Sequence, residues 1–385
     1  MRILCTFVGG AGHYEPLVPI ARAAVAAGHP VTFACRPSMV GVVLADGFAA
    51  CGSGPDVEDP VEIAELVAPD LRREERVLRD GFARRTALAR ARVIFDLGIE
   101  LRPDVVVSDE VDFGAMLAAE QLGLPYATVS VLAAGSFARA ELLSEPLAEV
   151  RAQLGLAPDP ELEMLGRHLV VVPCPPSFRD PARPLPATAL AIRPAVLEPT
   201  AASAAGVPAW LGEPGDRLTV YVTLGTIFNM ESGDLFARLL DGLAGLPVDV
   251  IATVGRQLDP SSFDPVPANV RIERFIPQAL VLPTCDLVVS HGGSGSVIGA
   301  LSFGLPSVLL PMGADQTHNA ARCEDLGVAV VLDPMQATAG TIRDAAAAVL
   351  ADPSFRQRAA RFAREAAALP PASVAVARLE ALLRG

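Results

Sequence analysis

The sequence contains no lysine, because all 31 of its basic residues are arginine. A Schiff-base lysine and a Walker A phosphate loop are therefore excluded, since each needs a lysine amine. Aromatic residues make up only 5% of the chain and charged residues 19%, whereas hydrophobic residues reach 51%. This balance excludes a chain dominated by a disordered tail or a solvated coiled coil. At 385 residues, the chain is predicted to form two globular domains.

An excess of positive charge is also lacking. The formal net charge of −13 disfavours nucleic acid and anionic lipid as partners. The six cysteines contain no C-x-x-C pair, so the sequence predicts neither a zinc ribbon nor a redox dithiol, and cytosolic thiols are the simpler interpretation. There is no signal-peptide cleavage site and no run of about 18 apolar residues. We expect a soluble, cytoplasmic protein without a membrane span. The sequence leaves open whether the chain forms a homodimer.

Short apolar runs alternate with alanine-rich helical stretches, which predicts doubly wound parallel sheets. The alternation lapses across residues 173–214, where proline recurs, and a domain boundary is expected there. The sequence thus predicts an α/β protein with two Rossmann-like domains and a cleft between them. The expected domains are 1–205, which ends in the proline-rich linker, and 206–366. A last segment, 367–385, is expected to be a helix that packs back on the first domain.

The most informative segment is 287–296, which has the pattern of a buried strand, a glycine-rich turn and the start of a helix. Glycines let backbone N–H groups approach an anion, and the helix N-terminus adds positive potential. A diphosphate would fit there, with hydrogen bonds from His291, Ser294 and Ser296. The alternative is an ordinary tight turn, and this motif alone does not decide between the two.

Two further polar loops accompany this turn. Residues 275–278 lie at the end of one predicted strand and residues 310–319 follow another, so three such loops are expected at one crevice. In order and spacing, residues 275–319 resemble the donor-binding signature of the GT-B glycosyltransferases, which include plant natural-product and bacterial antibiotic glycosyltransferases. The resemblance implies a transferase that moves a sugar from a nucleotide-sugar donor to a small hydrophobic acceptor.

The resemblance implies a role for each matching residue. An aromatic residue stacks on the base, His291 and Ser296 contact phosphate, and Asp315 and Gln316 hold the sugar hydroxyls. Outside this context, the aromatic residue at 275 would be a core side chain and the Thr226 hydroxyl a turn cap. The full set of donor-binding residues implied is Thr226, Phe275, Ile276, Gln278, His291, Gly293, Ser294, Gly295, Ser296, Asp315, Gln316 and Asn319.

One position departs from the family pattern. Relatives that use ribonucleotides commonly carry a glutamate three residues after the second serine of the motif, where it accepts hydrogen bonds from the ribose hydroxyls. This chain has Gly299 there. The departure favours a deoxyribonucleotide, such as a dTDP-sugar, over UDP-glucose.

A second glycine-rich loop, residues 9–16, follows the first predicted strand. A dinucleotide fingerprint would need a third glycine where Glu15 stands, and Pro16 removes a further N–H donor. A neutral imidazole suits proton abstraction from an alcohol near pH 7. A lone loop histidine is usually only solvated, but this loop resembles the catalytic loop of the family. The resemblance therefore implies that His13 is the general base.

A histidine base needs a carboxylate that orients its other nitrogen. Asp109 ends a predicted strand at the sheet edge that carries His13, and it matches the aspartate partner of the family. Asp112 is the second candidate, and N-capping of the next helix is the structural alternative for both. We favour Asp109.

No Asp-x-Asp element stands at a convincing strand end, so we expect no metal and no further cofactor. The expected reaction is a single in-line displacement that inverts the anomeric carbon. Residues 55–102 are charged and helical and residues 137–165 apolar and irregular, and in the family such segments build the acceptor pocket. Five apolar side chains there and nearby would suit a flat acceptor but are more often core: Phe82, Phe95, Phe113, Phe137 and Leu143.

Three other functions remain open from the sequence. An epimerase of the same fold would keep the phosphate site but needs several carboxylates around the sugar. An NADP-dependent oxidoreductase could use Gly10, Gly12 and Arg36. A non-catalytic helper of another transferase would keep the fold but is expected to lack His13 or Asp109, and both are present.

Overall fold

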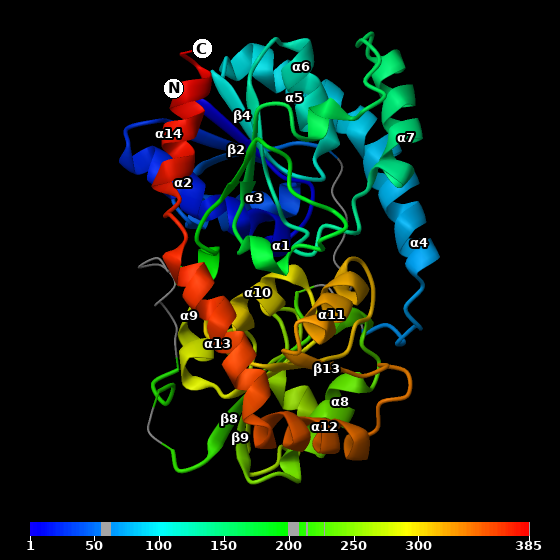
Figure 1. The fold of residues 1–385 in the computed structure, drawn as a ribbon, viewed down its shortest axis with the longest axis vertical. Helices are drawn as coiled ribbons and strands as arrows, with labels where there is room; N and C mark the ends of the chain where they lie inside the picture. The colour runs from blue at the N-terminus through cyan, green and yellow to red at the C-terminus, as the bar shows by residue number, and fades with distance from the viewer. Residues whose placement is uncertain (55–62, 199–207, 213–214, 227, 385) are drawn as a thin grey trace. The chain divides into compact units, whose positions relative to one another are not determined.

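The computed structural model describes residues 1–54, 63–198, 208–212, 215–226 and 228–384. The chain forms two compact units (Figure 1). Unit 1 comprises Met1–Glu58, Arg72–Ala195 and Leu369–Gly385, and unit 2 comprises Asp59–Leu71 and Val196–Ala368. Each unit contains one parallel sheet with helices on both faces, so the predicted α/β class is confirmed.

The sheet of unit 1 has the strand order β3-β2-β1-β4-β5-β6-β7. Its central strands consist of buried β-branched and other apolar residues, as expected for a parallel sheet that is covered on both faces. The chain reverses its direction of strand addition between β1 and β4. The strands are β1 (Ile3–Thr6), β2 (Val31–Cys35), β3 (Ala49–Gly52), β4 (Val105–Asp109), β5 (Tyr126–Val129), β6 (Leu169–Val172) and β7 (Ala189–Ala191).

Two hydrophobic clusters cover the faces of this sheet. One includes α2, α3 and α14, and the other includes α5, α6 and α7. Gly114 lets α5 and α6 pack closely, because a Cβ there would lie 2.6 Å from the carbonyl oxygen of Ala87. The helices are α1 (Ala11–Tyr14), α2 (Val18–Ala26), α3 (Pro37–Ala45), α4 (Leu71–Arg76), the π-helix η2 (Val77–Thr86), α5 (Ala87–Leu101), α6 (Phe113–Gln121), α7 (Ala140–Gln153) and α14 (Ser373–Leu382), with 3-10 turns η1 (Glu15–Leu17), η3 (Glu163–Leu165), η4 (Pro176–Phe178) and η5 (Ala195–Leu197) along the chain.

The two ends of the chain meet in unit 1 (Figure 1). The amino group of Met1 lies 3.2 Å from Nδ1 of His29, and Nε2 of the same ring lies 2.8 Å from the Glu380 carboxylate on α14. Val376 and Leu379 of α14 are buried in the core that α2 shares. The last helix therefore completes one face of the first sheet.

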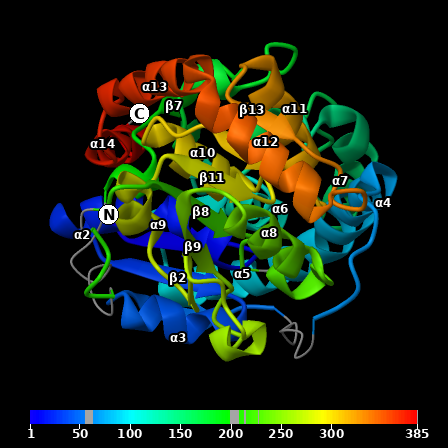
Figure 2. The same ribbon diagram turned by 90° about the horizontal axis from the view of Figure 1, so that it is seen from below.

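The sheet of unit 2 has the order β10-β9-β8-β11-β12-β13, with every pair parallel and a reversal between β8 and β11. Helices α8 and α12 pack on one face, and α9 and α10 lie over the other, where α10 contacts α13 (Figure 2). A Thr338 capping box starts α12. The strands are β8 (Leu218–Thr223), β9 (Val248–Thr253), β10 (Val270–Glu273), β11 (Leu287–Ser290), β12 (Ser307–Leu309) and β13 (Ala329–Val331).

The helices of unit 2 alternate with these strands. They are η7 (Phe228–Glu231), α8 (Leu235–Ala244), η8 (Pro260–Phe263), α9 (Gln278–Val281), η9 (Leu282–Thr284), α10 (Ser294–Ser302), α11 (Gln316–Asp325), α12 (Ala339–Ala351) and α13 (Pro353–Ala368).

The division into units differs in detail from the sequence prediction. The boundary expected between 205 and 206 lies outside the described residues, and the units change at Ala195 and Val196. Asp59–Leu71 belongs to unit 2, although the prediction assigned it to the first domain. Residues 137–165 are not irregular, because α7 occupies Ala140–Gln153 with Pro146 inside it. Residues 55–62 of the predicted charged helical stretch lie outside the described residues.

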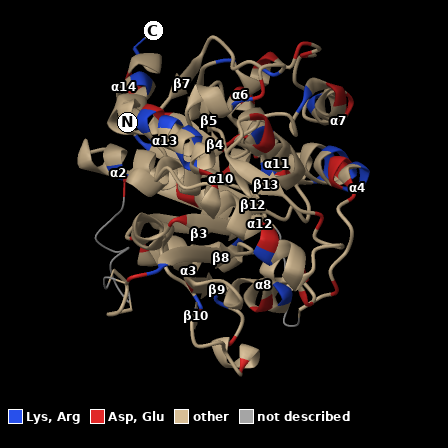
Figure 3. Cartoon of the chain, turned by 60° about the horizontal axis from the view of Figure 1, so that its bottom comes forward, with Lys and Arg blue, Asp and Glu red and all other residues tan. Residues whose placement is uncertain are grey.

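Acidic and basic residues occur together on α4 and α7, whereas α10 is largely uncharged (Figure 3). Ion pairs join η2 to α7, with Arg84 Nε 2.8 Å from Glu149.

Of the five apolar side chains considered for the acceptor, Phe113, Phe137 and Leu143 are buried in the core of unit 1 and the other two pack against it. No helix in the described part of the chain has the length and hydropathy that a membrane crossing needs.

Candidate active site

The predicted base and its partner lie at the carboxyl ends of neighbouring strands in unit 1. Nδ1 of His13, in the short helix after β1, is 3.2 Å from Oδ2 of Asp109, the last residue of β4. Strands β1 and β4 are adjacent at the point where the strand order reverses. Open α/β sheets typically bind their ligands outside the strand ends at such a point.

The Asp109 carboxylate is held rigidly. Its side chain is fully buried, whereas that of His13 is 25% exposed. Oδ2 accepts the Val8 N–H at 2.9 Å, and Oδ1 accepts the N–H groups of Val111 and Asp112 at 2.7 and 2.9 Å. These three backbone donors fix the orientation of the carboxylate toward the imidazole.

Glycine makes room for the imidazole. A Cβ at Gly9 would lie 2.0 Å from Cδ2 of His13, so any other residue would displace the ring. The backbone then turns at Gly10, whose carbonyl accepts the His13 N–H at 3.0 Å. The glycine-rich loop therefore serves to seat the histidine.

Asp112, the second candidate partner, is engaged elsewhere. Its carboxylate forms a two-point ion pair with the buried Arg90, at 2.9 and 2.6 Å, and also caps α6 by accepting the Ala115 N–H. Arg90 further donates to the carbonyl and hydroxyl oxygens of Ser53. This network joins α5, α6 and the end of β3, and no local sequence pattern predicts it because Arg90 lies far from Asp112 in the chain.

Glu110 is a second acid beside the pair. Its Oε1 accepts the N–H groups of Val131 and Leu132 at 2.6 and 2.5 Å. Burial raises the pKa of Glu110 to about 6, although these N–H groups and Arg179 act in the opposite direction. The carboxyl group thereby anchors the segment that follows β5.

The predicted phosphate ligand lies at the corresponding point of unit 2, between β8 and β11. His291 directly follows β11 and is only 7% exposed. Its ring fits against two glycines, because a Cβ at Gly225 or Gly293 would lie 2.7 or 2.5 Å from Nε2. Burial lowers the pKa of His291 to about 4, and the backbone of Thr223 acts in the opposite direction. The imidazole is therefore neutral near pH 7 and carries a single N–H donor.

The start of α10 is connected to the start of α11 by side chains. The Ser294 hydroxyl donates to Oδ2 of Asp315 at 2.6 Å, and Nδ2 of Asn319 donates to the same oxygen at 2.8 Å. Oε1 of Gln316 accepts the N–H groups of Met312 and Gly313, so the amide orientation is fixed. The structure thus brings together the residues predicted after β11 and β12.

Gln278 lies where the family glutamate would project. Its Oε1 would be 2.7 Å from a Cβ on Gly299, and its Nε2 donates to the Ser296 hydroxyl at 3.3 Å. An amide therefore occupies the space next to the missing carboxylate. Gly295 lies beside Ser296 in the first turn of α10.

Phe275 lies beyond the end of β10 at Glu273, not within the strand as predicted, and it is 38% exposed. The guanidinium carbon of Arg256 is 4.0 Å from the centre of its ring. The next residue, Ile276, is buried. Thr226 is exposed and follows β8 by three residues. The sequence contains no local signal that predicts the contact between Phe275 and Arg256.

Among the described residues, no three His, Cys, Asp or Glu side chains are grouped so that they could hold a metal ion.

Comparison with known proteins identifies the family. Residues 237–382 match the family described as erythromycin biosynthesis protein CIII-like, C-terminal domain. The chain is 33% identical to L-demethylnoviosyl transferase of Streptomyces niveus, with 97% of each chain covered. It is 30% identical to TDP-daunosamine transferase DnrS of Streptomyces peucetius, with 99% of this chain and 97% of that protein covered.

A solved structure agrees with these relatives. The crystal structure of the glycosyltransferase VinC in complex with dTDP matches all of both chains, with a TM-score of 0.77 and 26% identity. The relatives are transferases, and the epimerase, oxidoreductase and helper alternatives receive no support. The chain therefore belongs to the GT-B glycosyltransferases of antibiotic biosynthesis.

Proposed function

We propose that this enzyme transfers a deoxysugar from a dTDP-sugar to a hydroxyl group of a small hydrophobic acceptor, with inversion at the anomeric carbon and without a metal. The observation that carries the proposal is the contact of 3.2 Å between His13 and the fully buried Asp109. A histidine that is oriented by a carboxylate is the arrangement that activates an alcohol as a nucleophile.

In this mechanism the two imidazole nitrogens have different tasks. Nδ1–H donates to Asp109, which leaves Nε2 to accept the proton of the acceptor hydroxyl. The negative charge of the carboxylate then stabilises the imidazolium that forms. The hydroxyl oxygen attacks the anomeric carbon as the bond to the diphosphate breaks, so the sugar is transferred in a single step.

The leaving diphosphate is assigned to the start of α10. The first N–H groups of an α-helix lack an acceptor within the helix and are suited to bind an anion, and α10 begins directly after the glycine-rich turn. His291 adds one N–H donor, and its neutral form contributes no charge that must be desolvated. The first-turn amides and the helix dipole would stabilise the charge that develops on the diphosphate.

The preference for dTDP is supported by Gly299 and by the relatives. Without a carboxylate at 299, no acidic side chain is available there for a ribose 2′-hydroxyl, and Gln278 fills the space. One relative is named a TDP-daunosamine transferase, and VinC was crystallised with dTDP. Asp315 and Gln316, held by the network described above, are assigned to the sugar hydroxyls.

The test compares His13→Ala with the unaltered enzyme in transfer from a dTDP-deoxysugar to alcohol acceptors. The variant should lose about 10²- to 10⁴-fold in rate, the usual contribution of a general base, while dTDP affinity stays unchanged. His29→Ala is the matched control, because the His29 ring contacts the amino group of Met1 and the carboxylate of Glu380 near the two ends of the chain. An equally active His13→Ala enzyme would place the base elsewhere, and a product of retained configuration would refute the single displacement.

A further inference from the structure

A short segment from the first half of the sequence is built into unit 2. We call residues 63–66, within Asp59–Leu71, the strap. The Ala64 N–H donates to the Met230 carbonyl at 2.7 Å, and the Ala64 carbonyl accepts the Gly233 N–H at 3.1 Å. The chain returns to unit 1 at Arg72. The strap is thus bound through its backbone to the turn that follows β8.

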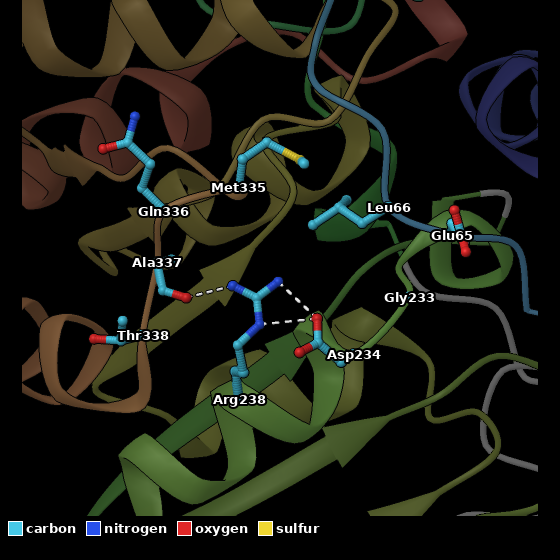
Figure 4. A pocket seen from close by; sticks show the side chains of 9 residues that line it. All are labelled: Glu65, Leu66, Gly233, Asp234, Arg238, Met335, Gln336, Ala337 and Thr338. Atoms are coloured by element: carbon cyan, nitrogen blue, oxygen red, sulfur yellow. Dashed lines mark hydrogen bonds and ion pairs between the residues drawn. The ribbon is translucent and has the colours of Figure 1, made fainter.

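Side-chain packing reinforces these hydrogen bonds. Leu66 is half-buried and packs against the core of unit 2. Gly233 has a φ of 51°, and a Cβ there would lie 2.9 Å from the Leu66 nitrogen, so only glycine lets the strap come this close. Figure 4 shows the side chains of Leu66 and Met335 lining the same cavity, with Gly233 labelled near Leu66.

The cavity beside the strap, of about 480 Å³, is not a convincing anion site. Its cation, Arg238, already donates to Asp234 and to the Ala337 carbonyl (Figure 4), and it also donates to the Pro334 carbonyl. The contact that matters for function is instead the one between the strap and the turn after β8.

That turn leads to the proposed phosphate site. The strap holds η7 (Phe228–Glu231) on one side, and on the other the buried Asn229 donates to the Val254 carbonyl at 2.7 Å. The ring of Phe228 lies 6.1 Å from that of His291. A shift of η7 would therefore reach both His291 and the backbone at Gly225, against which the imidazole rests.

We infer that Ala64 and Leu66 of the strap are positioning residues for the donor diphosphate site. The inference rests on the proposed function, because it takes His291 as a ligand of the diphosphate. It means that donor affinity depends on residues far upstream in the chain.

The test measures dTDP affinity by calorimetry on the full chain. Leu66→Ala and Gly233→Ala should each weaken dTDP binding about 2- to 30-fold, the range expected for a change transmitted through packed neighbours. Val67→Ala is the matched control within the same segment, since Val67 is 55% exposed. Gly123→Ala controls for a positive φ, because it has a φ of 66° and no atom within 4 Å of an added Cβ.

Kinetics separate positioning from loss of stability. The KM for the donor should rise while the KM for the acceptor stays constant, and Leu66→Met should restore donor affinity. If Gly233→Ala does not fold, Leu66→Ala carries the test alone.

Two outcomes distinguish this inference from the proposed function. Wild-type dTDP affinity in Leu66→Ala, together with weakened affinity in His291→Ala, would overturn the strap inference and leave the donor site intact. Unchanged affinity in His291→Ala would refute the donor assignment and, with it, the strap inference, because that inference takes His291 as a ligand of the diphosphate.

Discussion

Replacing Asp109 by asparagine tests how the base is oriented. In the native site Oδ1 accepts two backbone N–H groups, and Oδ2 accepts the Val8 N–H and faces Nδ1 of His13. An asparagine has a single acceptor oxygen. Because the position of Oδ1 faces two donors, the amide oxygen should take that position and place its NH₂ group next to Val8 and His13. The imidazole would then accept at Nδ1 and carry its proton mainly on Nε2, so that only the less populated tautomer, with Nε2 unprotonated, would act as the base.

The size of the rate loss expected for Asp109→Asn follows from the interactions that the substitution removes. A hydrogen bond to a charged group contributes about 1.5 to 3 kcal/mol, so loss of support for the imidazolium should lower the transfer rate about 10- to 150-fold. This is a smaller loss than expected for His13→Ala, because the imidazole survives. The Val8 N–H loses its acceptor as well, which should lower the free energy of unfolding by about 1 to 3 kcal/mol.

The assay measures transfer rates at saturating donor for acceptors of different hydroxyl pKa. The loss should be largest for aliphatic alcohols and shrink for phenols, whose proton leaves more readily. Asp104→Asn serves as the control, because Asp104 accepts the Arg2 N–H near the opposite end of β4 and should not affect transfer. A folded Asp109→Asn enzyme with the native rate on aliphatic alcohols would refute the assignment of Asp109.

Three further predictions concern unit 2. Burial lowers the pKa of His291 to about 4, below its unfolded value of about 6.5. Since the unfolded chain takes up the proton first, the free energy of unfolding should fall by about 3 kcal/mol between pH 6.5 and 4, and His291→Gln should remove that part of the pH dependence in denaturation curves. Gly299→Glu should move nucleotide preference from dTDP toward UDP in competition binding, with a larger effect when Gln278→Ala makes room for the new side chain; an unaltered preference in the double variant would contradict the role of Gly299. Phe275→Ala should weaken dTDP binding by about 1 to 3 kcal/mol in calorimetry, the typical contribution of base stacking, and native affinity would mean that the base binds elsewhere.

Much of the fold follows from local sequence patterns. Apolar runs that alternate with helical stretches predicted the parallel sheets of both units, and the buried strand expected at the start of 287–296 is β11 (Leu287–Ser290). Strand β3 escaped prediction because it consists of small, partly exposed residues. Strand β7 lies in the proline-rich stretch that was interpreted as a linker, because its pairing with β6 is not encoded locally.

The sequence by itself determined which residues stand at the strand ends. Parallel strands bring their carboxyl ends to one edge of a sheet, so His13 and Asp109, and likewise His291 and Asp315, were expected at the same sheet edge. The resemblance to a known family then attached roles to these positions.

Only the tertiary structure decided what each side chain contacts. It placed Asp109 beside His13 and paired Asp112 with Arg90, which lies 22 residues away in the chain. It also bound Ala64 to Met230, a contact between segments that no periodicity or motif connects. Such contacts depend on the packing of helices and loops whose positions are set by the whole fold, whereas the strand ends depend on neighbours in the sequence.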